Sequence, residues 1–124
     1  MNSDLSADEL YCNGVEFLSA NQPSEAAEAF RAALRADPAY IDALHGLVRA
    51  LREAGQFEAS IASARALTVL APTDPLAQTA LSISLQHGNQ IAEAEAARAR
   101  ARILEWKQQL AADSEAEPQA EERP

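Results

Sequence analysis

The sequence predicts an all-helical protein built from antiparallel helix pairs, and three observations support this fold class. Turn residues recur every 34 positions, at Asn21-Gln22-Pro23, Gly55-Gln56-Phe57 and Asn89-Gln90-Ile91, with Ala26, Ser60 and Ala94 at the same spacing. A fixed period of this length indicates stacked copies of one supersecondary unit. Alanine, the strongest helix former, provides 29 of the 124 residues. There is no apolar alternation long enough for a sheet.

Local signals mark where each helix begins and ends. Ser6 and Glu9 form a capping box before the first helix. Pro23 and Pro75 suit the first turn of a helix, and Asp74 caps the helix that Pro75 begins. Gly55 is expected to close the third helix in a left-handed conformation. The predicted helices cover residues 7–20, 23–36, 40–54, 57–70 and 75–88, followed by a longer one from near residue 90 to about residues 110–112.

Composition excludes several classes of function. The net charge is −9 without a basic patch, which disfavours binding to nucleic acids and to anionic membranes. The sequence has no signal peptide and no apolar stretch of the roughly 20 residues that span a bilayer, so we expect a cytoplasmic protein. A single cysteine allows neither an internal disulfide nor a multi-cysteine zinc site. We expect no metal and no other cofactor.

The residues at the repeated positions resemble the tetratricopeptide repeat (TPR) family, whose unit is two antiparallel helices, A and B, over 34 residues. The first unit fits best. The second has Val48 in place of the close-approach glycine, and the third has Ser82 there, Arg98 in place of a large apolar residue and Trp106 in place of proline. The family positions matched in the first unit are Leu10, Gly14, Phe17, Ala26, Phe30, Ala33 and Pro38.

The resemblance implies a right-handed superhelix of three helix pairs, with units at about residues 7–40, 41–74 and 75–108. We expect the repeats to form one domain of residues 7–112, with residues 1–6 as an N-terminal arm in front of it. The A helices of the family line a concave groove that binds a peptide. The resemblance therefore implies a non-catalytic adaptor or scaffold with a protein partner. The groove residues it implies are Tyr11, Val15, His45, Arg49, Arg52, Thr79, Ile83 and His87, together with Asp8, Cys12, Ser19, Asp42, Glu53, Leu76 and Ala80.

The basic and polar middle of this groove, between more apolar flanks, suits a peptide with an acidic group and one or two apolar anchors. Co-chaperones of the family grip a C-terminal carboxylate with Lys, Asn, Asn, Lys and Arg. None of these residue types occurs at the matching positions of this sequence, so we predict that it is not a carboxylate clamp. The matching residues are Tyr11, Val15, Gly46, Leu76 and Ala80.

Two other functions remain open. Ile103, Trp106 and Leu110 recur at spacings of three and four and form an apolar stripe. This stripe either folds back on the third unit or supports self-association, which would make the protein a self-assembling structural module and a homo-oligomer. A small enzyme that uses Cys12 would need a base such as His45 across the groove. Residues 113–124 are acidic and have no large apolar side chain, so we expect a disordered tail.

Overall fold

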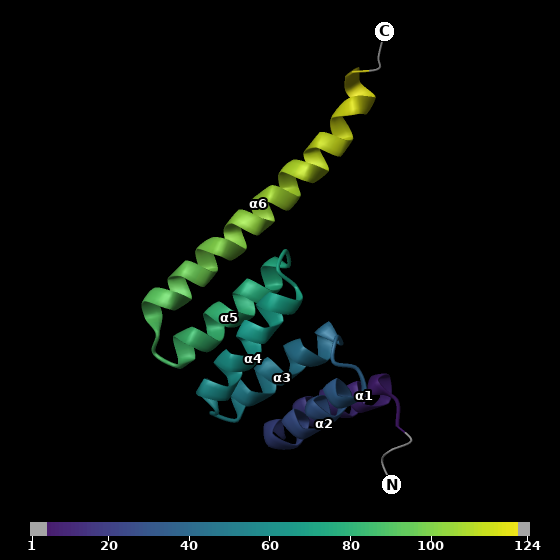
Figure 1. Ribbon diagram of the computed structural model, residues 1–124, viewed down its shortest axis with the longest axis vertical. Helices are drawn as coiled ribbons and strands as arrows, with labels where there is room; N and C mark the ends of the chain where they lie inside the picture. The colour runs from purple at the N-terminus through teal and green to yellow at the C-terminus, as the bar shows by residue number, and fades with distance from the viewer. Residues whose placement is uncertain (1–4, 122–124) are drawn as a thin grey trace.

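Six helices account for nearly all of residues 5–121, which are the residues that the computed structural model describes (Figure 1). They pack as consecutive antiparallel pairs, and the last helix runs well beyond the others. The prediction of an all-helical fold with an extended C-terminal helix is confirmed. The helices are α1 (Ala7–Ser19), α2 (Pro23–Ala36), α3 (Ile41–Glu53), α4 (Phe57–Leu70), α5 (Pro75–His87) and α6 (Ile91–Glu121).

The 34-residue period has a conformational cause in the turn within each helix pair. Asn21, Gly55 and Asn89 occupy equivalent positions, and all three have positive φ, at 60°, 78° and 62°. The next residue in each turn donates its N–H to a carbonyl five residues earlier, from Gln22 to Phe17 at 2.8 Å in the first pair. Gln56 and Gln90 make the same bond to Leu51 and Leu85. This bond is the hallmark of the Schellman motif, which favours Gly or Asn at the left-handed position.

The capping predictions are also confirmed. The Ser6 hydroxyl accepts from the Glu9 N–H at 3.1 Å, and the Glu9 carboxylate accepts from the Ser6 N–H at 3.0 Å. The Ser6 N–H, and next to it the Ser6 hydroxyl, stabilise the ionised Glu9 carboxylate and hold its pKa below its usual value. Asp74 accepts from the Leu76 N–H at 2.9 Å and caps α5. α1 and α5 therefore begin where the local chemistry of the sequence places their caps.

Phe30 of α2 fills the space between the first and second helix pairs, and it is fully buried. A Cβ atom at Gly14 of α1 would lie 2.5 Å from its ring, and one at Gly46 of α3 would lie 2.6 Å from it. The ring therefore occupies the volume that two missing side chains leave on opposite sides. Gly14 was expected to allow a close approach of the first two helices, and the structure adds Gly46 to the same contact.

The equivalent crossings of the second and third pairs are joined by hydroxyl groups. Ser60 of α4 donates to the carbonyl oxygen of Val48 in α3 at 2.8 Å. Ser82 of α5 donates to the carbonyl oxygen of Ala94 in α6, also at 2.8 Å. Val48 and Ser82 are equivalent repeat positions, as are Ser60 and Ala94. The second and third pairs thus make the same contact. The donor hydroxyl lies on the second helix of the pair in one case and on the first helix in the other.

The prediction for the end of the sixth helix was wrong, because α6 continues past residue 112 to Glu121. Residues 113–121 were expected to be disordered but are helical in the structure. Alanine, glutamate and glutamine are good helix formers, and they extend a helix that is already nucleated. Residues 1–4, most of the expected N-terminal arm, and residues 122–124 of the expected tail lie outside the described residues.

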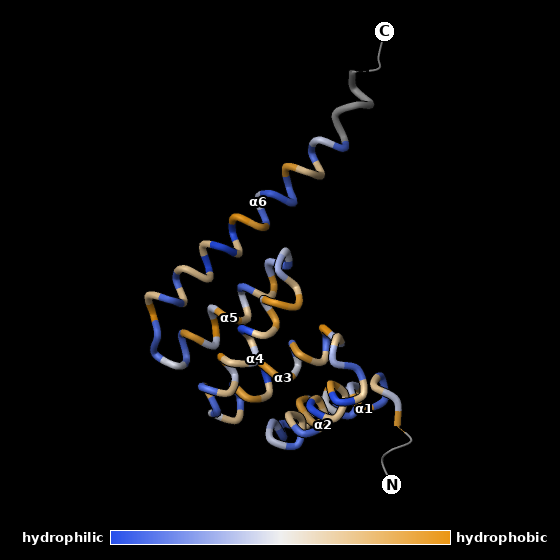
Figure 2. The backbone as a smooth tube through the Cα atoms, viewed as in Figure 1, coloured by the Kyte–Doolittle hydropathy of each residue, from blue (hydrophilic) through white to orange (hydrophobic). Residues whose placement is uncertain are grey.

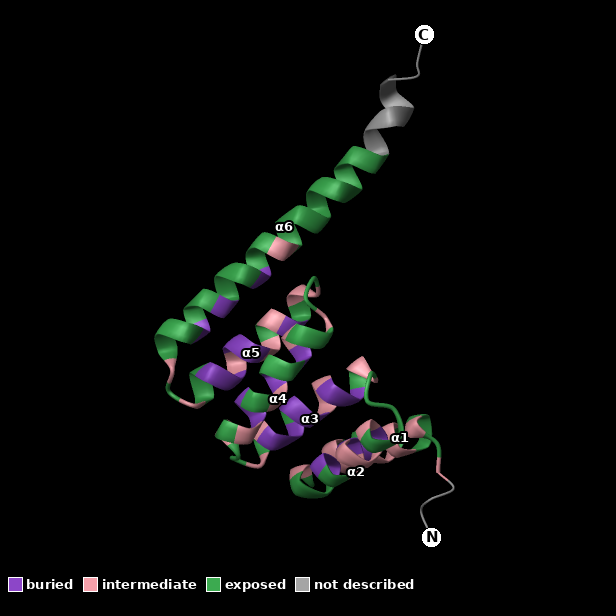
Figure 3. Cartoon of the chain, viewed as in Figure 1, coloured by how far each residue is buried: buried purple, intermediate pink, exposed green. Residues whose placement is uncertain are grey.

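α6 packs along α5 through small side chains, and its far half projects past the rest of the fold (Figure 3). Ala94, Ala97 and Ala101 are buried on this face, and Gln108 still reaches the Thr73 carbonyl oxygen at 3.1 Å. From Glu105 to Glu115 the side chains are exposed. Most of this helix is hydrophilic, with apolar residues at intervals (Figure 2). Within residues 5–121, none of the helices combines the length and apolar character needed to cross a bilayer.

Candidate functional site

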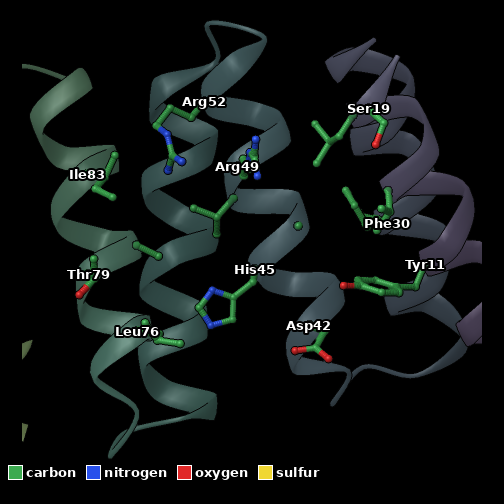
Figure 4. A pocket seen from close by; sticks show the side chains of 15 residues that line it. Tyr11, Ser19, Phe30, Asp42, His45, Arg49, Arg52, Leu76, Thr79 and Ile83 are labelled. Carbon is green, nitrogen blue, oxygen red and sulfur yellow. The ribbon is translucent and has the colours of Figure 1, made fainter. Parts of the chain in front are cut away.

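A groove of about 610 Å³ crosses α1, α3 and α5, the first helix of each pair (Figure 4). Tyr11 and Ser19 lie at the α1 side, and Leu76, Thr79 and Ile83 lie at the α5 side. The middle helix, α3, contributes the polar side chains between them. The groove is lined by Tyr11, Val15, Leu18, Ser19, Phe30, Asp42, His45, Gly46, Val48, Arg49, Arg52, Leu76, Thr79, Ala80 and Ile83.

Seven of the eight principal groove residues inferred from the sequence line this groove, and His87 does not. His87 lies in the last turn of α5, where its Nδ1 is 2.9 Å from the Ile83 carbonyl oxygen. Its ring packs against Phe57 of α4, with the ring centroids 5.8 Å apart. The contact with α4 therefore holds the ring away from the groove.

The apolar floor of the groove was missed by the sequence interpretation. Phe30 and Val48 are buried and Leu18 is half-buried, and all three line the groove. Phe30 belongs to α2, so a search restricted to the A helices could not find it. The available signal was Gly46, because a glycine on α3 leaves the neighbouring α2 side chain open to the groove.

Three basic side chains of α3 lie in the groove, and two of them face carboxylates. Arg49 donates from Nε to Glu53 at 2.7 Å, one helical turn later. His45 Nε2 lies 3.7 Å from Asp74 Oδ2. Both pairs are at least partly exposed to solvent, so each contributes little to stability. Their effect is to reduce the net positive charge that the groove presents.

Arg52 has a different environment from the other two. It is partly buried, and burial lowers the pKa of its guanidinium. Its Nη1 lies 3.5 Å from the Ser84 hydroxyl, which in turn is 2.8 Å from the Ser60 hydroxyl. Among residues 5–115, whose side chains the structure describes, no carboxylate oxygen lies within 4.0 Å of this guanidinium. A partly desolvated cation without a carboxylate is the group in the groove that gains most from an incoming anion.

One end of the groove is built from stacked aromatic rings. Tyr11 stacks on Tyr40 with the ring centroids 5.2 Å apart, and it also contacts Phe30 at 5.8 Å. The Tyr40 hydroxyl donates to Asp8 at 2.6 Å, and this bond raises the pKa of Tyr40 to about 12. Asp8 thus fixes Tyr40 and does not line the groove. These contacts hold the Tyr11 ring in one orientation at the groove wall.

The remaining candidates lie elsewhere. Cys12 is exposed and does not line the groove that contains His45. Glu53 contacts the groove only through its ion pair with Arg49. In the part of the chain that the structure describes, no three His, Cys, Asp or Glu side chains converge as metal ligands would. Ile103, Trp106 and Leu110 are 49 %, 64 % and 47 % exposed on α6, so the stripe does not fold back on the third pair.

The pairing of helices, the repeated left-handed turn and the groove across the first helices agree with the comparison to known families. The family model described as tetratricopeptide repeat matches residues 17–84, more than half of the chain. The chain belongs to the tetratricopeptide repeat family. Members of this family are typically non-catalytic modules for protein–protein interaction. The search of curated protein sequences found no match.

Solved structures of TPR proteins share the fold at low sequence identity. The crystal structure of MamA matches with a TM-score of 0.77 and 19 % identity, over 83 % of this chain and 60 % of MamA. The chain thus spans about three fifths of that relative's length. The second TPR of Spaghetti (RPAP3), bound to the HSP90 peptide SRMEEVD, matches with a TM-score of 0.74 and 15 % identity. The match covers 80 % of this chain and 92 % of that chain.

The type III secretion translocator chaperone SycD of Yersinia enterocolitica, in an alternative dimer, matches over nearly the whole length of both proteins. Its TM-score is 0.74 at 20 % identity, over 94 % of this chain and 95 % of that chain. Identities this low establish the fold and not the partner. TPR proteins of this shape thus include a peptide-bound module and a dimeric chaperone.

Proposed function

We propose that this TPR protein is a non-catalytic adaptor that binds a peptide segment of a partner protein along the groove of α1, α3 and α5. The bound segment carries an acidic side chain opposite Arg52. Apolar side chains of the segment pack on Tyr11 and Val15 at one wall and on Leu76 and Ile83 at the other. The observation that carries the proposal is the partly buried Arg52, which lacks a carboxylate partner among the described residues.

A randomised peptide library, selected against the protein, tests this proposal. We expect the selected peptides to share an acidic residue next to one or two apolar residues. Arg52→Glu should weaken their binding roughly 10- to 100-fold, because a hydrogen bond to a charged group contributes about 1.5–3 kcal/mol. Arg35→Glu is the matched control, since Arg35 is an exposed arginine of α2 outside the groove. Equal loss with both variants would contradict the groove assignment.

The carboxylate-clamp mode of binding is not expected for this groove. Tyr11, Val15, Gly46, Leu76 and Ala80 stand at the clamp positions and provide no Lys, Asn or Arg side chain there. The peptide SRMEEVD, seen bound to the second TPR of Spaghetti (RPAP3), is therefore a suitable negative probe. We expect no binding in the micromolar range by isothermal titration calorimetry. Micromolar binding of this peptide would show that the clamp prediction is wrong.

Self-association through α6 is the second candidate function, and the exposure of Trp106 favours it. The stripe residues do not line the groove, so a dimer formed through them leaves the peptide site open. The two functions are compatible and can be tested separately. A concentration-dependent mass by light scattering, lost on Trp106→Ala, is the expected result for self-association.

A further inference from the structure

The exposed apolar stripe of α6 is longer than its three large residues. Successive residues of an α-helix are rotated by about 100°, which places Ile103, Trp106 and Leu110 on the side roughly opposite Ala94, Ala97 and Ala101. Ala92, Ala96 and Ala99 are exposed and continue the stripe at alternating spacings of four and three. We call these six residues the seam: Ala92, Ala96, Ala99, Ile103, Trp106 and Leu110. Alternating three and four spacing is the pattern that pairs helices in a coiled coil.

The seam does not occupy the place where another repeat would stack. Ala27 and Phe30 of the first pair are buried and cluster with residues of the second pair. Their equivalents in the second pair, Ile61 and Ala64, are buried and cluster with residues of the third pair. The equivalent positions of α6 hold Glu95 and Arg98, both exposed. A charged side chain at these positions closes the array, since stacking a further pair would bury it. The seam is a separate surface, on another side of the same helix.

The charges of α6 are divided along its length. Residues 98–107 hold four bases and one acid, whereas residues 108–115 hold two acids and no base. Two copies paired in parallel would place bases beside bases and acids beside acids. Two copies paired antiparallel about a point near residue 108 place each basic segment beside the acidic segment of the other. Like charges at such close range disfavour a pairing, so the charge pattern selects the antiparallel one.

The geometry points to an antiparallel two-fold pairing of α6 with α6 of a second copy of this chain. In this arrangement Trp106 of each copy lies opposite Leu110 of the other, and Arg102 lies beside Asp113 of the other copy, because both flank the seam. An isologous contact of this kind is self-complementary and stops at the dimer. Because α5 covers the opposite side of α6, the helix bundles of the two copies stay on the outside of the pair.

Sedimentation equilibrium on the full chain over a wide concentration range tests the pairing, which rests on the self-association proposed above. We expect a monomer–dimer equilibrium that Trp106→Ala weakens at least tenfold. Val69→Ala is the matched control, since Val69 is an exposed apolar residue of α4 outside the seam. Helical circular dichroism should be unchanged in both variants because neither side chain is buried. A chain that stays monomeric overturns both the pairing and the self-association.

Charge reversal tests the orientation separately. Arg102→Glu should weaken the dimer, and so should Asp113→Lys. The two substitutions together should restore it, because the two positions again carry opposite charges. A dimer that Trp106→Ala disrupts, but that the double variant Arg102→Glu/Asp113→Lys does not restore, overturns the antiparallel orientation and leaves self-association standing. Peptide binding in the groove should be the same in all of these variants, which separates this test from that of the groove.

Discussion

The first helix pair places Phe30 at the repeat position where the third pair places Arg98. Phe30 is fully buried between Gly14 and Gly46, and Arg98 is exposed on α6. The second pair lies between these extremes, with Ala64 at the same position and Val48 in place of the glycine. A large residue thus faces a glycine in the first pair, and a small one faces valine in the second. The comparison indicates that the first two pairs keep the combined size of the two facing residues rather than their identity, whereas the third pair leaves the position exposed.

Phe30→Ala should break this arrangement most severely. The substitution removes a ring that contacts two helix pairs and leaves a cavity that Gly14 and Gly46 cannot fill. Losses of about 3–5 kcal/mol are usual for a buried phenylalanine of this kind. Urea unfolding followed by circular dichroism measures the effect. A loss below about 1 kcal/mol would mean that the helices close over the space, which their backbone contacts make unfavourable.

Gly14→Ala tests the same contact from the other side. Alanine favours a helix over glycine by about 1 kcal/mol, but its Cβ would lie 2.5 Å from the Phe30 ring. We expect net destabilisation of about 1–3 kcal/mol in the same unfolding assay, because overpacking a tight crossing forces side chains out of their rotamers. The double variant Gly14→Val/Phe30→Ala copies the second pair. It should be more stable than Phe30→Ala alone, and the absence of any recovery would argue against volume conservation.

Most of the fold could be predicted from the sequence because its signals are local. The turn at Asn21, Gly55 and Asn89 and the caps at Ser6 and Asp74 each involve residues only a few positions apart. The groove walls followed from these boundaries through the family resemblance. The floor of the groove did not, because the position of Phe30 depends on Gly14 and Gly46 from two different pairs. Size compensation between Val48 and Ala64 likewise appears only when both helices are in place.

Two further errors have the same origin. The ring of His87 turns away from the groove because of a contact with Phe57, 30 positions earlier in the chain. The end of α6 was placed too early because loss of apolar residues was taken as loss of structure. Alanine and glutamate extend a helix without any packing partner, once a packed segment such as residues 91–104 has nucleated it.

Ser60→Ala should produce a smaller effect than either change at the first crossing. The Ser60 hydroxyl donates to the Val48 carbonyl oxygen and contacts the Ser84 hydroxyl, and both serines are fully buried. Its removal should cost about 1 kcal/mol, the usual net contribution of such a hydrogen bond. Ser82→Ala is the matched variant in the third pair, where the hydroxyl bonds only to the Ala94 carbonyl oxygen. Differential scanning calorimetry should show the larger drop in Tm for Ser60→Ala.

Arg98→Ala should have the smallest effect, within about 0.5 kcal/mol, although its position is the one where Phe30→Ala is most damaging. The reason is that no fourth pair covers α6 among the described residues, so the side chain at this position stays exposed to solvent. Unfolding of the Arg98→Ala and Phe30→Ala variants under identical conditions measures the contrast directly. A large loss at Arg98 would mean that another surface, from a second copy or from elsewhere, covers this end of the array. In that case the exposed charges Glu95 and Arg98 would not be a cap, and the difference between the first and third pairs would need another cause.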